Sequence, residues 1–584
     1  MATFSARSPV SAILAVDDAR SVIERLAPEF LDSPMVRHLS DFPIAPIAAL
    51  ILGENDARIL EIVEGICRVT DPRPPRVEEE PVLVRDDYEA AETRRGSAVL
   101  RLPPTALQNA TTDIELIGPS HGNPFVDVDV TAEFRLGPRA VHVGAFYDGN
   151  GRYILRFLPP EPGVWTFETR SNARSLDDIE GTLEVQPSDL PGPVRVVDTF
   201  HFAHENGQTF RPFGTTAYAW IHQPESLQRE TIAALKASPF TKIRMCLFPK
   251  HYIYNSEEPS RFVWPKKSDD EWDTTRFDLD YWRALEKNVQ ELDAIGVQAD
   301  LILFHPYDRW ELSNQSRVAD DRYVRYAARR LGGLPNVWWS LANEYELLLG
   351  KDPADWDRIA RVIQTEDHVG HLLSIHNWIE LWDFSSDWAT HCSIQKGERL
   401  SASTKEWRAR WAKPVVLDEC GYEGDLDQGW GNLTGQQVIQ RSWEVAINGG
   451  YPNHGETFYR EDEQIWWSKG GRLIGHAPAR IAFLQSIVAD SPTGRLDPLT
   501  SPWDFPLGGV EGEYEVLYFG QSQPSFRDLE LPDGMTAEID VIDTWAMTIE
   551  TLPEPASGTV RVPLPARPYC ALRIRRVEPF TEAD

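Results

Sequence analysis

The regular alternation of strand-like and helical segments between about residues 195 and 490 limits the possible folds of this chain most strongly. Longer segments with helical periodicity, such as 281–295 and 320–331, separate eight apolar runs of strand length. The eight runs lie at 211–220, 241–248, 297–304, 336–344, 371–378, 388–395, 413–419 and 450–456. Eight strands that alternate with helices are typical of a (β/α)8 barrel, which we therefore predict as a TIM barrel.

Short alternating strands are expected on both sides of the barrel. The stretch V-D-V-D-V-T-A-E-F at 126–134 has a period of two, and 146–157 contains the turn sequence D-G-N-G between apolar runs. Both patterns predict an N-terminal β-sandwich. Further alternating runs at 514–519, 537–542 and 571–577 predict a small C-terminal β-domain.

The N-terminal segment has helical rather than strand periodicity. Residues 55–67 carry isoleucine and valine at i, i+3, i+4 and i+7, with Asn55 as the expected N-cap, and 17–26 predicts an earlier helix. The following sequence D-P-R-P-P-R-V-E-E-E-P opposes packing and predicts a linker. We expect the following division: a helical module at 1–67, a linker at 68–105, a β-sandwich at 106–194, the barrel at 195–492 and the C-terminal β-domain at 493–584.

Charge and cysteine usage narrow the class of partner. The 584 residues carry a formal net charge of −32, which would repel nucleic acid. No apolar run reaches the roughly 18 residues of a membrane span, and the first 20 residues lack the apolar region of a signal peptide. Five scattered cysteines without C-x-x-C spacing predict a reduced, cytoplasmic chain. The assembly state stays open, with a homo-oligomer as one alternative.

Polar side chains end nearly every predicted barrel strand. Catalytic residues of such barrels lie at the carboxyl ends of the strands, so these positions are the candidates for chemistry. They are Arg244, His305, Asp308, Asn343, Glu344, His376, Asn377, His391, Asp418, Glu419 and Glu456.

Two of these residues, Glu344 and Glu419, end strongly apolar runs that would be strands four and seven. Their side chains would then approach each other across the barrel mouth. Carboxyls about 5–5.5 Å apart suit glycoside hydrolysis with retention, and a gap of roughly 6.5–9.5 Å suits inversion. In such a pair the ionised carboxylate attacks, and the other carboxyl, with a raised pKa, donates a proton.

The sequences around both glutamates resemble those of a known enzyme group. N-V-W-W-S-L-A-N-E-Y-E at 336–346 resembles the acid/base strand of clan A glycoside hydrolases, and P-V-V-L-D-E-C-G at 414–421 resembles their nucleophile strand. The motifs N-P-F-V-D-V, F-Y-D-G-N-G-R-Y, R-P-F-G-T-T-A-Y-A-W, H-G-E-T-F-Y and I-W-W-S-K-G-G are similar to those of the apiosidase-like branch, which carries an N-terminal β-sandwich. The resemblance covers about 105–580.

The resemblance implies a retaining glycosidase that acts on a small carbohydrate without a cofactor or metal. It implies Glu344 as the acid/base, Glu419 as the nucleophile, Asn343 as the partner of the sugar 2-hydroxyl and Arg244 as the group that keeps Glu419 ionised. Five further residues are candidates for the sugar pocket: His305, Trp378, His391, Glu456 and Trp466. A cytoplasmic enzyme would meet short oligosaccharides or glycosides, which favours exo action.

Several alternatives stay open at this stage. Asp418 is a rival nucleophile, although period-two alternation should turn it away from the side on which Glu419 lies. Glu344 could serve only the dipole of a following helix, and Glu419 could be only a structural partner of Arg244.

Two other classes of protein also fit parts of the sequence. The 20 tryptophans, 13 of them between 310 and 467, would suit a catalytically silent carbohydrate-binding protein. A metal-dependent barrel hydrolase would use histidine and aspartate ligands drawn from His305, Asp308, His376, His391 and His454.

Overall fold

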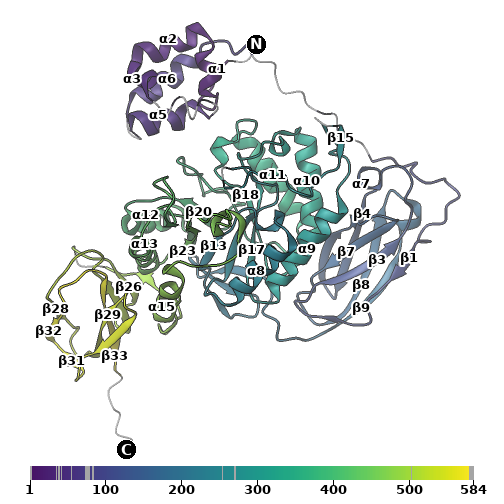
Figure 1. The fold of residues 1–584 in the computed structure, drawn as a ribbon. Helices are drawn as coiled ribbons and strands as arrows, with labels where there is room; N and C mark the ends of the chain where they lie inside the picture. The colour runs from purple at the N-terminus through teal and green to yellow at the C-terminus, as the bar shows by residue number, and fades with distance from the viewer. Residues whose placement is uncertain are drawn as a thin grey trace, which may run out of the picture.

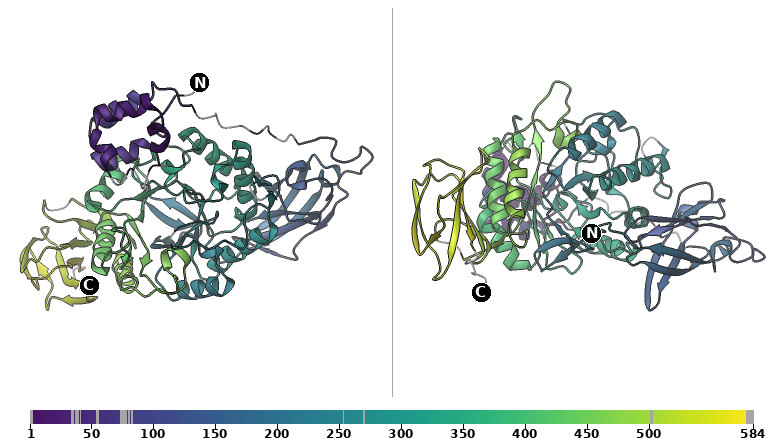
Figure 2. Two further views of the ribbon diagram at one scale, coloured as in Figure 1. Left: turned by 45° about the horizontal axis from the view of Figure 1, so that its top comes forward. Right: turned by 90° about the horizontal axis from the view of Figure 1, so that it is seen from below.

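The computed structural model contains four folded units in chain order (Figure 1): a helical module, a β-sandwich, a barrel and a C-terminal β-domain. The structure describes residues 3–577 apart from 34–35, 37–39, 41, 54–55, 73–78, 80, 82–83, 253, 269–270 and 501–502. The two β-units lie on opposite sides of the barrel, and the helical module forms a separate layer beside it (Figures 1 and 2).

Eight parallel strands form the barrel at the centre of the molecule. In sheet order they are β19 (Leu373–Ser374), β18 (Val337–Ala342), β17 (Gln298–Phe304), β14 (Lys242–Cys246), β13 (Gly214–Thr216), β23 (Tyr451–His454), β21 (Val415–Glu419) and β20 (Cys392–Gln395). A parallel bridge between His376 and Ser393 closes the ring between β19 and β20. The structure therefore confirms the predicted (β/α)8 barrel.

Helices surround the barrel strands, and polar caps fix where several of them begin. They are α8 (Glu225–Lys236), α9 (Leu279–Asp293), α10 (Arg317–Leu331), α11 (Pro353–Glu366), α12 (Leu400–Trp411), α13 (Gly435–Ile447) and α15 (Ala477–Ala489). Asp278 accepts hydrogen bonds from two N–H groups of α9, and Asp352 forms a capping box at α11. The connection 375–391, between β19 and β20, contains no helix, which leaves Trp378 on a loop.

The sandwich consists of two sheets around a common apolar core, and all of their strand pairs are antiparallel except the parallel pair β2–β9. One contains β1 (Val99–Arg101), β3 (Thr112–Ile117), β7 (Arg152–Phe157) and β6 (Phe146–Tyr147). The other contains β2 (Ala106–Leu107), β9 (Glu180–Gln186), β8 (Gly163–Ser171), β4 (Val130–Leu136) and β5 (Arg139–Gly144). The predicted turn joins β6 to β7, with positive φ at Gly149, Asn150 and Gly151.

The expected strand at 126–134 begins later than predicted. Residues Pro124–Asp127 form the short helix α7, and β4 starts only at Val130. The Asp127 carboxylate accepts the Asn123 N–H at 2.6 Å, and this local bond holds the chain in a turn. Period-two alternation alone did not reveal that competing hydrogen bond.

The helical module contains α1 (Val10–Leu14), α2 (Asp17–Leu26), α3 (Pro28–Asp32), α5 (Ile44–Leu52) and α6 (Arg58–Ile66) around its own apolar core. The predicted N-cap Asn55 lies outside the described residues. Arg7 donates to the main-chain oxygens of Lys351 (2.6 Å) and Tyr345 (3.4 Å) on the barrel. Trp378 packs against the module core, with its ring 6.2 Å from that of Phe42. The module therefore rests on the loop that follows β18.

The C-terminal domain is built mainly from one antiparallel sheet: β25 (Asp497–Pro498), β26 (Leu507–Val510), β27 (Tyr514–Tyr518), β33 (Cys570–Arg576), β29 (Thr536–Asp543) and β30 (Thr548–Thr551), with β31 (Ala556–Ser557) also pairing with β29. Strands β28 (Phe526–Glu530) and β32 (Thr559–Pro563) form a second, two-stranded sheet. Tyr518 stacks on Trp443 of α13, which joins this domain to the barrel. In the described part of the chain, no helix has the length and apolar character needed to cross a membrane.

A buried carboxylate joins the sandwich to the barrel. Asp148, in the β6–β7 turn, contacts Arg330 at 2.9 Å and both Arg283 and Arg152 at 3.1 Å. Arg330 is almost fully buried. The arginines hold the pKa of Asp148 below its usual range although burial alone would raise it. The interface therefore depends on a carboxylate that stays ionised.

We predict that Asp148→Ala destabilises the protein by about 3 kcal/mol, because it removes one partner from a buried ion pair. Urea-induced unfolding followed by tryptophan fluorescence measures the loss. Glu168→Ala is the control, since it breaks a sandwich ion pair with Arg170 whose side chains are about half exposed, and should cost less than about 1 kcal/mol. Equal losses in the two variants would contradict the role of Asp148.

Candidate active site

A cavity of about 370 Å³ opens at the carboxyl ends of the barrel strands. Both predicted catalytic glutamates, Glu344 and Glu419, line it. Its other lining residues are Tyr218, Lys250, Tyr252, Tyr307, Asn343, Trp378, Gln395, Lys396, Gly397, Glu398, Cys420, Gly421, Tyr422, Gly429, Trp430, Arg441 and Trp467. Aromatic walls with a few polar and charged groups are typical of a ligand pocket, and indole and phenol rings suit the apolar faces of sugars.

Glu344 stands in a strained backbone conformation directly after β18. Its φ of 49° lies in the left-handed region, which is costly for a residue with a side chain and is found most often at functional sites. The Tyr307 hydroxyl donates to Glu344 Oε2 at 2.5 Å. Burial raises the pKa of Glu344, while the Tyr307 hydrogen bond and Lys250 partly oppose that rise. Such a carboxyl is suited to hold and donate a proton.

Glu419 is the last residue of β21 and is only 9% exposed. Its Oε1 atom has no hydrogen-bond partner among the described residues. Burial raises the pKa of Glu419 to about 8, and the neighbouring Tyr422 hydroxyl offsets only part of this rise. The cavity thus contains two carboxyls whose ionised forms are both disfavoured.

Arg244 lies beneath the cavity and does not hold Glu419 ionised, as the sequence had suggested. Its guanidinium contacts Asp300 at 3.2 Å and Asp418 at 3.4 Å, and Lys242 Nζ lies 2.6 Å and 2.7 Å from the same two carboxylates. The four charges neutralise one another in the barrel interior. Because the Arg244 guanidinium pairs with Asp300 and Asp418, Glu419 lacks the cation that would lower its pKa.

Asp418, the rival nucleophile, points into this ion network. It is 1% exposed and accepts from Ser393 Oγ at 2.5 Å in addition to its ion pairs. Lys242 and Arg244 hold its pKa well below the usual range against the effect of burial. It does not line the cavity, which agrees with the alternation of side chains along β21.

Two other predicted site residues reach the cavity. Asn343 Oδ1 accepts from Arg244 Nη2 at 3.0 Å and from the Tyr218 hydroxyl at 3.2 Å, so the Asn343 amide group is fixed from below. Trp378 also lines the cavity, and its side chain packs against the helical module. The loop without a helix after β19 is what lets Trp378 touch both.

Three residues expected at the sugar pocket lie elsewhere. His305 is fully buried, with its Nε2 3.0 Å from the Phe248 carbonyl oxygen, and His391 is buried beside Trp338. Burial lowers the pKa of His305 to about 3 and that of His391 to about 4. Trp466 donates from its Nε1 to Thr215 Oγ1 at 2.8 Å, and its neighbour Trp467 lines the cavity instead.

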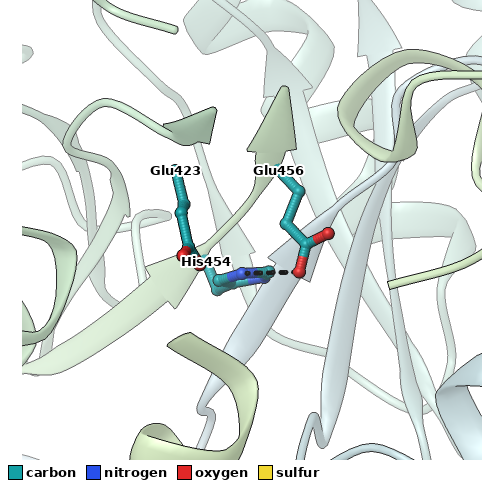
Figure 3. A group of neighbouring side chains, drawn as sticks. All are labelled: Glu423, His454 and Glu456. Atoms are coloured by element: carbon teal, nitrogen blue, oxygen red, sulfur yellow. Dashed lines mark ion pairs between the residues drawn. The ribbon is translucent and has the colours of Figure 1, made fainter. Parts of the chain in front are cut away.

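Glu456 was also expected at the pocket, but it belongs to a buried cluster with Glu423 and His454 (Figure 3). Ligand atoms of the three residues lie within 4.8 Å of one another, so this cluster could hold a cation. Each carboxylate already accepts two main-chain N–H groups from 474–477, at 2.8–3.0 Å. Glu456 and Glu423 thereby fix the start of α15 rather than line the cavity.

The metal-dependent alternative drew its ligands from five residues, which are His305, Asp308, His376, His391 and His454. Within the described ranges, only the Glu423, His454 and Glu456 group brings three possible ligands this close together. His454 is therefore the one member of the proposed ligand set that lies in such a group.

Sequence reasoning missed several cavity residues that are bound to the carboxyls or face them. Lys250 and Tyr307 follow barrel strands by a few residues, and Tyr422 follows Glu419 by three. Their only sequence signal was position just beyond a strand end, which many structural residues share. The side of the barrel on which each loop folds back could not be read from the sequence.

Comparison with known proteins agrees with this geometry. A model described as the apiosidase-like catalytic domain matches 198–471, and two models described as domains of unknown function, DUF5060 and DUF5605, match 108–172 and 503–575. The crystal structure of a candidate glycoside hydrolase from Bacteroides vulgatus ATCC 8482 is 32% identical, with a TM-score of 0.77, and covers 81% of this chain and 100% of its own. This chain belongs to the glycoside hydrolases.

More distant structures share the fold with this glycosidase. A family 5 glycoside hydrolase from the same Bacteroides strain is 15% identical, with a TM-score of 0.51 over 66% of this chain and 94% of its own. Another structure named glycoside hydrolase is 13% identical, with a TM-score of 0.52 over 66% of this chain and 97% of its own. No curated protein sequence matches the chain.

We predict that Glu419→Gln makes the glycosidase more stable than the wild type at pH 8, with a much smaller difference at pH 5. The native state keeps a proton on Glu419 up to a pKa of about 8, whereas the unfolded chain releases it near the ordinary glutamate pKa of 4.5. Wild-type stability therefore falls with rising pH in this window by up to about 1.4 kcal/mol per unit, and Gln removes that loss.

Thermal unfolding of both proteins between pH 5 and pH 8 measures the effect. Glu398→Gln is the matched control, because Glu398 also lines the cavity but is exposed, and it should give no gain that grows with pH. A constant stability difference between wild type and Glu419→Gln across this range would contradict the raised pKa.

Proposed function

We propose that this glycosidase hydrolyses its substrate with net retention, using Glu419 as the nucleophile and Glu344 as the acid/base. Glu419 attacks the anomeric carbon while Glu344 protonates the leaving oxygen, which yields a glycosyl ester on Glu419. Glu344 then removes a proton from water, and the resulting attack releases the sugar. The observation that carries the proposal is that the two carboxyls line one cavity at the ends of β18 and β21.

The hydrogen bonding of the two carboxyls supports this division of roles. Glu344 accepts a short hydrogen bond from Tyr307 and has a raised pKa, which suits a group that alternates between acid and base. Glu419 has an unbonded Oε1 atom, which is available for attack. With a pKa of about 8, about a tenth of Glu419 is ionised at pH 7 in the empty cavity, so the reactive form is a minor population.

Asn343 is suited to bind the sugar 2-hydroxyl. Its Oδ1 is occupied by Arg244 and Tyr218, so the amide Nδ2 is the group left to donate toward the cavity. Hydrogen bonds to the 2-hydroxyl strengthen in the transition state of glycoside hydrolysis. The ion network below would thus act on catalysis through the orientation of Asn343.

The size of the cavity favours exo action on a short substrate. A volume of about 370 Å³ lies near the lower end of the 300–1,000 Å³ range of ligand pockets. A second cavity of about 700 Å³ shares Gly397, Glu398 and Arg441 with it and reaches the C-terminal domain at Phe505. We propose that the leaving group of a short oligosaccharide extends toward this second space.

We predict that Glu419→Ala lowers turnover of a cleaved nitrophenyl glycoside by about 10⁴-fold or more, because it removes the nucleophile. A panel of such glycosides, furanosides included, first identifies the sugar. Added azide should restore activity by direct attack in the vacated space and give a glycosyl azide of inverted configuration, assigned by NMR.

Glu344→Ala is the matched variant for the second role. With a nitrophenyl leaving group it should form the glycosyl ester, and azide should then give a product of retained configuration. Inverted product from Glu344→Ala, or no azide product from Glu419→Ala, would reject the assignment of the two roles.

A further inference from the structure

Lys250 is a buried cation in the wall of the catalytic cavity. The residue is 5% exposed and follows β14 by four positions. Its ammonium lies 3.8 Å from the ring centre of Tyr218, 4.4 Å from that of Tyr307, 4.6 Å from that of Trp467 and 5.9 Å from that of Tyr252. Four aromatic rings therefore surround one positive charge.

The aromatic rings do not replace an anion. Each cation–π contact contributes roughly 0.5–2 kcal/mol, whereas burial of an ammonium costs several kcal/mol. Among the described residues, no acceptor lies within hydrogen-bonding distance of Lys250 Nζ and no carboxylate within ion-pair distance. Burial accordingly lowers the pKa of Lys250 to about 8, which still leaves it mostly charged at pH 7.

The catalytic carboxyl beside Lys250 is not its partner. Tyr307 stands between the two groups, since its ring faces the ammonium and its hydroxyl donates to Glu344 Oε2. Glu344 must carry a proton before the leaving oxygen departs. In that neutral form it does not balance the positive charge of Lys250. An anion supplied by the bound molecule would compensate the charge at that step.

We infer that the cavity binds a sugar unit that carries a carboxylate, a uronic acid, whose carboxylate pairs with Lys250. This inference deepens the proposed glycosidase function and rests on it. A carboxylate matches the single charge of one ammonium, and the surrounding rings would cover the apolar face of the same sugar. Arg441, another cation of the cavity wall, already donates to the Cys420 carbonyl oxygen.

The test is equilibrium binding of free sugars, which involves no bond cleavage. Glucuronate and galacturonate are titrated against glucose and galactose, using calorimetry or the fluorescence of Trp430 and Trp467 in the cavity wall. At least one uronate should bind at least tenfold more tightly than the neutral hexose of the same configuration. Lys250→Met, which keeps the length of the side chain but removes the charge, should abolish that preference and leave hexose binding within about twofold.

Lys287→Met is the control variant, because this exposed lysine lies on α9 and pairs with Glu225 outside the cavity. It should keep the preference for the uronate. If Lys250→Met does not fold, as judged by circular dichroism, the wild type still decides: glucuronamide, which has nearly the size of glucuronate without its charge, should bind as weakly as glucose.

Several outcomes would overturn the inference. They are equal binding of uronates and hexoses, equal binding of glucuronate and glucuronamide, and tighter binding of glucose 6-phosphate than of either uronate. Failure of the catalytic proposal would look different, since a uronate preference that depends on Lys250 could persist while no nitrophenyl glycoside, uronides included, is cleaved.

Discussion

A network of four buried charges in the barrel interior supports the catalytic cavity. Lys242 and Arg244 come from β14, Asp300 from β17 and Asp418 from β21, and all four are nearly inaccessible to solvent. Removing one member of such a network leaves an uncompensated charge, so the network acts as a unit. It links three barrel strands, and through Arg244 it fixes Asn343, the residue next to Glu344.

The cavity above this network combines few charges with many aromatic rings. Tyr218, Tyr307 and Trp467 each border a charged group, and together they exclude water from the carboxyls. Exclusion of water raises the pKa of both glutamates and strengthens every remaining electrostatic contact. The aromatic residues therefore set the electrostatics of the site as well as its shape.

The barrel could be predicted from the sequence because its signals are local and repeated. Each strand is a short apolar run, and a polar residue at its end marks the catalytic face, which located Glu344, Glu419 and Asn343. Orientation along a strand was also readable, since alternation separated Glu419 from Asp418.

What could not be predicted depends on contacts between segments far apart in the chain. Arg244 pairs with Asp300 and Asp418 instead of Glu419, and Glu456 turns toward 474–477 instead of the cavity. Lys250 owes its setting to rings drawn from three other segments of the chain. A strand-end position shows that a residue is near the site, but neighbours from other elements decide which way its side chain turns.

The way in which Arg7 holds the helical module to the barrel has a consequence for sequence variation. Its two hydrogen bonds end on peptide oxygens, those of Tyr345 and Lys351, which every amino acid supplies. Amino-acid substitutions in this loop would therefore leave the hydrogen bonds from Arg7 unchanged, whereas a change in the path of the backbone would break them. These contacts between the module and the barrel therefore depend on the backbone path of the segment after Glu344 and not on the side chains of that segment.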